Sequence, residues 1–374
     1  LIGAFAGDAI TTGGSNVAVG YNSLSTEDGH GGNVAVGTNV LAVQNAGQTA
    51  YNTAVGHNAG LSITTGIVNT LIGGLSGDAL TTANQNVAVG YATLSQDEKG
   101  SFSTAVGTGA LATQSFTTAT NVYNTAIGYN AGNAVTTGVG NTFLGGNAGD
   151  ATNDGNNNVG VGYEALSANC GDTNVGVGYV ALQACTGTDN TAVGAAAGLQ
   201  ITSGSNLTAL GHDAARTGSP GGAATTGSNA IYLGDANVTA IYAAVSSIST
   251  SDERDKTDFT DLDLGLDFVK ALKPVTYKWD KRSKYGDKYA EDYDLNAQVP
   301  DGTHKEDWLD IGFKAQEVIA LEEAAGYKIS DKTNLVSSFT DDETQYGLKY
   351  DRFVPILVKA IQEQDAIIQS LTAR

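Results

Sequence analysis

The pentapeptide Asn33-Val34-Ala35-Val36-Gly37 is one copy of a motif, Asn-x-Ala-Val-Gly, that recurs along the first 234 residues. The closing glycines of its copies, weaker ones included, run from Gly3 to Gly234 in steps of 16 to 23 residues, most of them 17. A unit this short cannot bury a core alone, so repetition at this period indicates coils that cover one another. The repeat therefore predicts a mostly β fold, a β-solenoid with one motif per coil.

Each position of the motif suits a place in such a coil. Val-Ala-Val sets a small residue between β-branched ones, which fits a strand buried on both faces. The glycine suits a corner with positive φ, and the recurrent asparagine can turn the chain and form a ladder from coil to coil. The repeats resemble the β-rolls in the heads of trimeric autotransporter adhesins. Because an open solenoid leaves a long flank, we expect three chains to wrap together into a homotrimeric shaft.

Composition divides the chain and limits its partners. The net charge is −20 over 374 residues, and Lys99 and Arg216 are the only bases before residue 251. Such acidity argues against nucleic acid as a partner, and no apolar run approaches the ~18–20 residues of a membrane span. No signal peptide is visible. The chain has no methionine and opens within a repeat, so we interpret it as a fragment of a longer protein.

Side chains that could bind metal or ligand are scattered. The histidines share no ligand spacing, so we predict neither a metal site nor a cofactor. Cys170 and Cys185 lie about one repeat apart, and we expect two small buried thiols. Recurrent Tyr and Asp residues admit a packing or turn role, or else sugar stacking and calcium binding, and we favour the structural role. They are Tyr21, Tyr91, Tyr129, Tyr163 and Tyr179 after corner glycines, and Asp8, Asp78, Asp150 and Asp235.

The two regions meet at Ser251-Asp252-Glu253-Arg254-Asp255-Lys256, which is preceded by Ile-Ser-Thr. Three further stretches follow in order: 272–279 (LKPVTYKW), 312–318 (GFKAQEV) and 348–351 (LKYD). Together they resemble the C-terminal intramolecular chaperone of phage tail fibres and tailspikes, the endosialidase-type self-cleaving domain. The resemblance covers roughly residues 246–374, although Lys314 stands where that family usually has an aliphatic residue.

The resemblance implies a Ser-Lys dyad that cuts its own chain. Ser251 would be the nucleophile, Lys256 its base, and the bond between Thr250 and Ser251 the cleavage site. Asp252, Glu253 and Arg254 are candidate supporting residues without assigned roles. A spacing of five sets the two side chains about 140° apart on an α-helix and on opposite faces of a strand. The dyad therefore needs a bend between its members, or a partner from another chain.

The base must also lose its proton before it can act. An ordinary lysine has a pKa of ~10.4, and lowering that by three units costs roughly 4 kcal/mol. Burial or a neighbouring cation is required, and Arg254 is the local candidate for the latter. We expect such burial only after folding or trimerisation, so that cleavage would report assembly. The simpler alternative is that the hexapeptide is a capped turn and Lys256 a solvated charge.

We predict four segments: a solenoid over 1–234, a connecting strand over 235–250, an α+β chaperone domain over 251–349 and a coiled-coil helix over 350–374. In the chaperone domain, Asp263 should cap a helix at 264–272 that Pro274 ends. Strands are expected at 275–279 and 309–313, a helix at 315–325, and a hairpin from 334–339 to 345–348.

The C-terminal segment has apolar residues at alternating steps of four and three, which is the spacing of a coiled-coil seam. A helix packed within one domain would show a similar stripe, so both arrangements remain open. The seam positions are Tyr350, Val354, Leu357, Ile361, Gln364, Ile368 and Leu371, of which Gln364 is a polar layer that could fix the register.

These features predict a structural tail-fibre fragment of a bacteriophage that binds a host-surface glycan or protein receptor. It would assemble in the host cytoplasm, reside in the virion tail and be extracellular after release. Its only enzymology would be single-turnover peptide cleavage. The alternatives are a trimeric surface adhesin of bacterial type and a polysaccharide-degrading tailspike. The latter needs a carboxylate pair in a cleft, whereas the acids of the repeats are scattered at turns.

Overall fold

The computed structural model describes residues 1–238, 251–288, 290, 292–340 and 342–373. It divides into two compact units. The solenoid unit comprises Leu1–Pro220 and Ala224–Asp235, and the C-terminal unit comprises Gly221–Ala223 and Ala236–Arg374. The expected connecting strand lies mostly outside the described residues, and its described part, residues 235–238, contains a turn and no strand.

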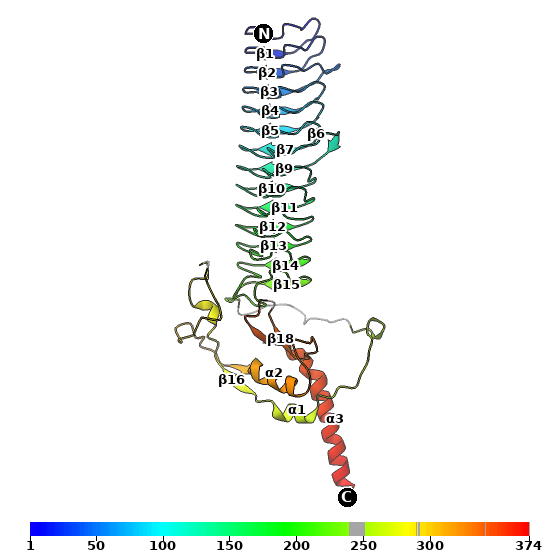
Figure 1. Ribbon diagram of the computed structural model, residues 1–374, viewed down its shortest axis with the longest axis vertical. Helices are drawn as coiled ribbons and strands as arrows, with labels where there is room; N and C mark the ends of the chain where they lie inside the picture. The colour runs from blue at the N-terminus through cyan, green and yellow to red at the C-terminus, as the bar shows by residue number, and fades with distance from the viewer. Residues whose placement is uncertain (239–250, 289, 291, 341, 374) are drawn as a thin grey trace. The chain divides into compact units, whose positions relative to one another are not determined.

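The solenoid unit is a stack of coils, each of which gives one short strand to a 13-stranded parallel sheet (Figure 1). Equivalent motif residues pair in register, as in Ala18 with Ala35. The β-solenoid predicted from the repeat is therefore confirmed. Its strands are β1 Val17–Val19, β2 Val34–Val36, β3 Thr53–Val55, β4 Thr70–Ile72, β5 Val87–Val89, β7 Thr104–Val106, β9 Thr125–Ile127, β10 Thr142–Leu144, β11 Val159–Val161, β12 Val175–Val177, β13 Thr191–Val193, β14 Leu207–Leu210 and β15 Ala230–Leu233; β6 Gly100–Ser101 pairs with β8 Thr120–Asn121 at a separate edge.

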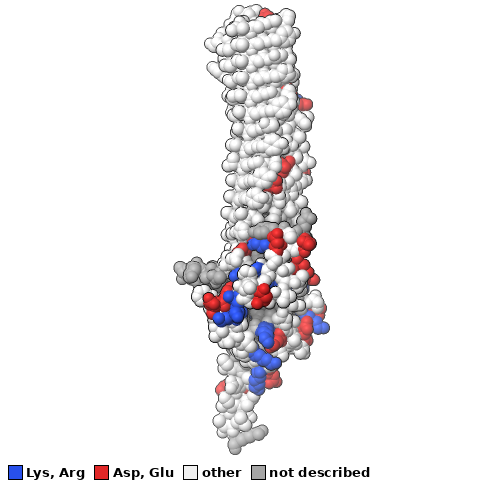
Figure 2. Space-filling view, turned by 90° about the vertical axis from the view of Figure 1, so that its left-hand side faces the viewer, with Lys and Arg blue, Asp and Glu red and all other residues white. Residues whose placement is uncertain are grey.

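The core of the solenoid unit follows from strand alternation. In a three-residue strand the middle side chain points inward and the flanking two point outward. The expected burial of the strand on both faces is therefore wrong: in β2, Ala35 is buried and the valines on either side of it are partly exposed. The middle residues, which include Leu71 and Phe143, are fully buried. Motif asparagines form the predicted ladder, because the Asn52 side-chain oxygen accepts from the Asn69 amide at 2.8 Å. Charged side chains are sparse over the coils on the face that Figure 2 shows.

The corner glycines have the positive φ that the motif predicts. Gly90 has φ +140°, and a Cβ there would lie 2.7 Å from the carbonyl of Gly107 in the next coil. Both the backbone conformation and the coil spacing therefore require glycine at this position.

The C-terminal unit is α+β, with three helices and two antiparallel strand pairs among the described residues. Its core joins α1, α2 and α3 through residues such as Phe268, Val318 and Ile356. The elements are η1 Glu253–Asp255, α1 Leu266–Ala271, β16 Val275–Tyr277, η2 Arg282–Lys284, β17 Asp310–Gly312, α2 Ala315–Ala324, β18 Ser337–Phe339, β19 Tyr346–Leu348, η3 Tyr350–Arg352 and α3 Phe353–Thr372.

One expected cap in this unit is wrong. Asp263 does not cap α1, which has Gly265 at its N-cap and no side-chain cap from the N-cap residue. Asp263 instead accepts a hydrogen bond from the Tyr327 hydroxyl. The Leu266 amide in the first turn of α1 donates to the Glu363 carboxylate of α3 at 2.7 Å. The carboxylate of Glu363, far along the chain, therefore accepts from the first turn of α1 in place of Asp263.

Candidate autoproteolytic site

The structure places Ser251 and Lys256 in contact. Lys256 Nζ donates to Ser251 Oγ at 2.6 Å and lies 3.3 Å from the Ser251 carbonyl oxygen. The bend between them is η1, a single 3₁₀ turn closed by the Lys256 amide, which donates to the Glu253 carbonyl at 3.1 Å. This turn meets the geometric requirement that a spacing of five imposes on an α-helix or a strand. The 2.6 Å separation is within the reach expected of a nucleophile and its base.

Asp252 holds this turn together. Its carboxylate accepts from the Arg254 amide at 2.9 Å, as an N-cap residue does. It also accepts from Arg254 Nε at 3.0 Å and from Nη2 at 2.6 Å, which makes a two-pronged ion pair. The hydrogen bonds from Arg254 lower the pKa of Asp252, and Asp252 raises the pKa of Arg254. The cation expected to assist Lys256 is therefore paired with Asp252.

The dyad is exposed to solvent, and the turn that holds it is capped by Asp252, as the simpler alternative of a capped turn with a solvated lysine describes. Ser251, Asp252, Glu253, Arg254 and Lys256 are all exposed in the isolated chain. The burial that would strip Lys256 of water is therefore not supplied by the described residues of one chain. Thr250, on the other side of the expected cleavage site, lies outside the described residues.

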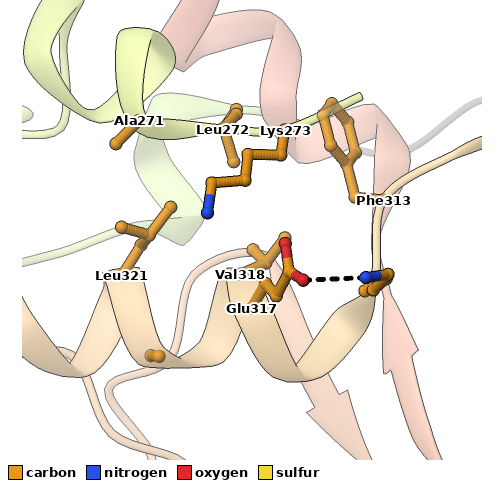
Figure 3. Close-up of a pocket in the computed structure, with 9 residues that line it drawn as sticks. Ala271, Leu272, Lys273, Phe313, Glu317, Val318 and Leu321 are labelled. Carbon is orange, nitrogen blue, oxygen red and sulfur yellow. Dashed lines mark hydrogen bonds and ion pairs between the residues drawn. The ribbon is translucent and has the colours of Figure 1, made fainter. Parts of the chain in front are cut away.

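A shallow pocket of about 230 Å³ opens between α1 and α2 (Figure 3). Leu272, Phe313 and Val318 give it an apolar lining. At its rim Lys314 Nζ lies 3.0 Å from Glu317 Oε1. No serine, threonine or cysteine lines the pocket, and it does not include the dyad.

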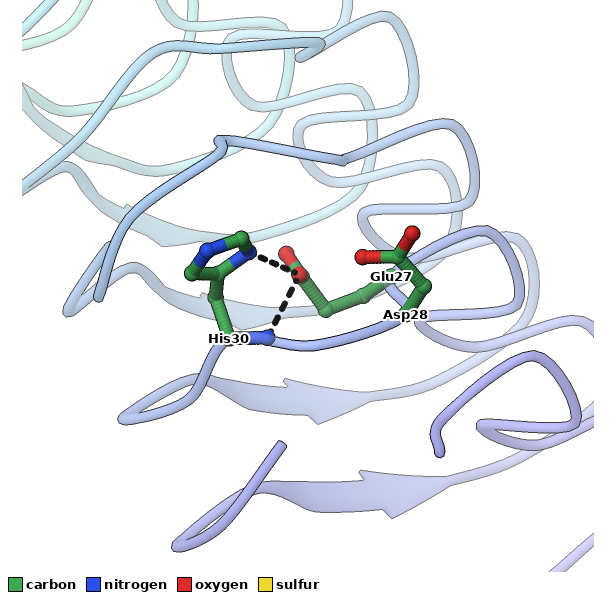
Figure 4. Close-up of side chains that lie close together, drawn as sticks. All are labelled: Glu27, Asp28 and His30. Atoms are coloured by element: carbon green, nitrogen blue, oxygen red, sulfur yellow. Dashed lines mark hydrogen bonds and ion pairs between the residues drawn. The ribbon is translucent and has the colours of Figure 1, made fainter. Parts of the chain in front are cut away.

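Two groups of possible metal ligands occur in the solenoid unit, where sequence spacing predicted none. Glu27, Asp28 and His30 form the first, with His30 Nδ1 3.4 Å from Glu27 Oε1 (Figure 4). The buried Glu27 carboxylate also accepts from the His30 amide and from Gln44 Nε2, both at 3.2 Å, so bonds within the protein already account for it.

The second group brings His212 within 3.5 Å of Asp213 and 3.6 Å of Asp235. Asp213 also pairs with Arg216 at 3.0 Å. Asp235 is one of the recurrent aspartates noted in the sequence, but its position beside His212 could not be predicted from spacing, because only the stacking of coils brings the two together.

The recurrent tyrosines lie on the surface of the coils. Tyr163 and Tyr179, which lie in neighbouring coils, stack with their ring centroids 5.9 Å apart. The ring of Tyr91 packs over Gly74 of the preceding coil, where its edge would be 3.6 Å from a Cβ if Gly74 had one. Both arrangements are contacts between coils, as the packing interpretation expects. The two cysteines are free and buried.

Comparison with known proteins adds one assignment. Residues 251–327 match the family model described as chaperone of endosialidase, so the match begins at Ser251 itself. No curated protein and no solved structure matches the chain. Among the described residues, no helix is both long and apolar enough to cross a membrane.

Proposed function

We propose that this chain is part of a phage tail fibre whose C-terminal region is an intramolecular chaperone that cuts itself from the shaft between Thr250 and Ser251. Two observations support the proposal. The match to the chaperone of endosialidase begins at Ser251, and Lys256 Nζ lies 2.6 Å from Ser251 Oγ. The contact between Lys256 and Ser251 is the observation that supports the proposed reaction, because a serine needs a base within hydrogen-bond reach to become a nucleophile.

The proposed reaction is an acyl shift followed by hydrolysis. Ser251 Oγ attacks the carbonyl carbon of Thr250 while Lys256 takes the hydroxyl proton. The C–N bond breaks, Lys256 returns the proton to the departing Ser251 amine, and an ester links Thr250 to Ser251 Oγ. Water hydrolyses this ester, which releases a carboxylate at Thr250 and restores the serine hydroxyl. Each chain reacts once.

The exposure of the dyad indicates when this reaction would occur. Lys256 must be neutral to act as a base, and an exposed lysine at neutral pH is protonated. Association with other copies would remove water from the dyad and favour the neutral amine. Cleavage would then follow assembly, and the exposed dyad of the isolated chain would be inactive.

The helix α3 supplies a surface for this association. Its residues Phe353, Ile356 and Ala360 are buried within the C-terminal unit. The seam residues lie on another face, where Leu357 is 44% and Ile361 64% exposed. Tyr350, the first seam residue, packs inside the chain against Phe313 and Phe353. The seam positions on α3 itself are exposed, which favours a coiled coil between copies.

Substitution in the seam tests the link between assembly and cleavage. Ile361→Asp should reduce the three-chain mass seen by light scattering and should also slow release of the C-terminal fragment. Ala366→Asp adds the same charge at an exposed position outside the seam and is the control. Cleavage at the normal rate by a monomeric Ile361→Asp protein would contradict the proposed order of events.

Once the chaperone has left, the shaft would serve as a tail fibre of the virion that binds a host-surface glycan or protein. This role rests on the likeness of the C-terminal region to tail-fibre chaperones and on the long repetitive shaft. Binding of the purified protein to capsule or lipopolysaccharide, with and without release of reducing sugar, would distinguish a receptor-binding fibre from a degrading tailspike.

A further inference from the structure

The solenoid unit has a long face of valine, isoleucine, leucine and threonine side chains that its own chain leaves partly exposed. It is formed by the outward-pointing residues of the 13-stranded sheet, here called the outward strip. The first outward position of each strand is Val, Thr or Ile, and the second is Val, Ile or Leu. The second column comprises Val19, Val36, Val55, Ile72, Val89, Val106, Ile127, Leu144, Val161, Val177, Val193, Leu210 and Leu233.

The strip is continuous because the strands pair in register. Each outward residue lies directly beside its equivalent in the next coil, as Val55 does beside Ile72. These side chains are only partly covered: Ile72 is 40%, Leu144 45% and Val193 42% exposed. No charged residue occupies an outward position in any of the 13 strands. Because charged residues are sparse throughout the repeats, the strip differs from the rest of the solenoid unit by its continuous columns of aliphatic and threonine side chains.

The size of the strip fits a protein interface. Thirteen strands about 4.8 Å apart span roughly 58 Å, and two outward side chains per strand make the strip roughly 10 Å wide. The resulting area of roughly 600 Å² is at the upper end of apolar patches on monomers and near the ~800 Å² that each partner buries in a standard interface.

We propose that the outward strip is the surface through which copies of this chain pack along the shaft. This inference rests on the proposed self-association and specifies where it occurs in the solenoid unit. Identical chains in parallel present the same strip to one another, so every coil meets its own equivalent. The apolar second column and the first column, which is mainly valine and threonine, then each match along the shaft. Close packing of β-branched side chains removes the strip from water without any charged group to desolvate. It also covers the flank that an open solenoid exposes.

Crosslinking at a single engineered cysteine tests this proposal. Val106→Cys places a thiol in the middle of the strip, and Thr65→Cys places one at an exposed site between β3 and β4, outside the strip. The native thiols of Cys170 and Cys185 are buried, so a short bismaleimide applied to the folded full-length protein should reach only the new cysteine. We expect two-chain covalent products from Val106→Cys, at least tenfold more than from Thr65→Cys.

Light scattering on the same samples separates the possible failures. A three-chain mass with no crosslinking at Val106→Cys would overturn the strip as the interface and leave self-association intact. A one-chain mass would overturn self-association itself, and with it the strip. Equal crosslinking at both cysteines would indicate random collision and would also overturn the proposal. Unchanged far-ultraviolet circular dichroism shows that each variant has folded.

Discussion

The buried carboxylate of Glu322 should decide the stability of the C-terminal unit. Glu322 lies in α2 and is 1% exposed. One of its oxygens accepts from the amides of Leu335 and Val336, both at 2.7 Å, and the other accepts from the Ser337 amide at 2.9 Å. This single side chain therefore fixes α2 to the segment that leads into β18.

The expected loss on truncation follows from these three bonds. A hydrogen bond to a charged group contributes roughly 1.5–3 kcal/mol, and a buried donor left without a partner costs about 1–3 kcal/mol. Water can reach some of the space that a shorter side chain leaves, so we expect Glu322→Ala to destabilise the unit by about 3–6 kcal/mol. That is a large share of the ~5–15 kcal/mol that stabilises a typical domain. Glu322→Gln keeps one acceptor oxygen and should lose less.

Urea unfolding followed by tryptophan emission measures this effect in the full chain. The chain has two tryptophans, Trp279 and Trp308, and both belong to the C-terminal unit, so the signal follows that unit. Glu323→Ala removes a neighbouring exposed carboxylate from the same helix and is the matched control. Equal midpoints for Glu322→Ala and Glu323→Ala would refute the reasoning.

Three further predictions concern the corners, the thiols and the turn of the dyad. Gly90→Ala should lower the calorimetric melting temperature of the shaft well below that of Gly14→Ala, where a Cβ meets nothing within 4 Å; equal melting temperatures would contradict the steric account of the corner. Burial raises the pKa of Cys170 from 9.0 to about 11 and also raises that of Cys185. Because the folded state holds the thiol protons more tightly than the unfolded state, the contribution of the thiols to stability is full below pH 9 and is lost as the pH rises toward 11. The urea midpoint should therefore fall more between pH 8 and pH 11 in the unmodified protein than in Cys170→Ala. An equal fall in the two proteins would contradict this prediction. Asp252→Ala should slow release of the C-terminal fragment at least several-fold, as intact mass recorded over time would show, because the 3₁₀ turn loses its cap; an unchanged rate would mean that this carboxylate does not position the dyad.

Much of the fold could be read from the sequence because its signals are local. The period of the motif places the 13 strands of the main sheet. The expected helix at 315–325 and the hairpin after residue 334 are present for the same reason. The period does not show that in Val34-Ala35-Val36 the small alanine is the buried residue and the two valines are partly exposed. The cap of α1 could not be found from local signals either, because Glu363 reaches Leu266 only through tertiary packing.

The sequence predicts the contact between the two residues of the candidate site, Ser251 and Lys256, but only part of their surroundings. The spacing of Ser251 and Lys256 requires a bend, and the structure supplies a 3₁₀ turn there. Arg254 was the local candidate for a cation that assists Lys256. It is paired instead with Asp252, the N-cap carboxylate two residues before it. The proposed burial of Lys256 by other copies of the chain would depend on contacts between chains that the sequence does not specify.

Intact mass spectrometry of the purified full-length protein tests the central claim most directly. After assembly, the unmodified chain should yield a fragment that begins at Ser251, while Ser251→Ala and Lys256→Met should remain whole. An unmodified chain that stays in one piece after trimerisation would contradict self-cleavage, and so would the same fragment from Ser251→Ala.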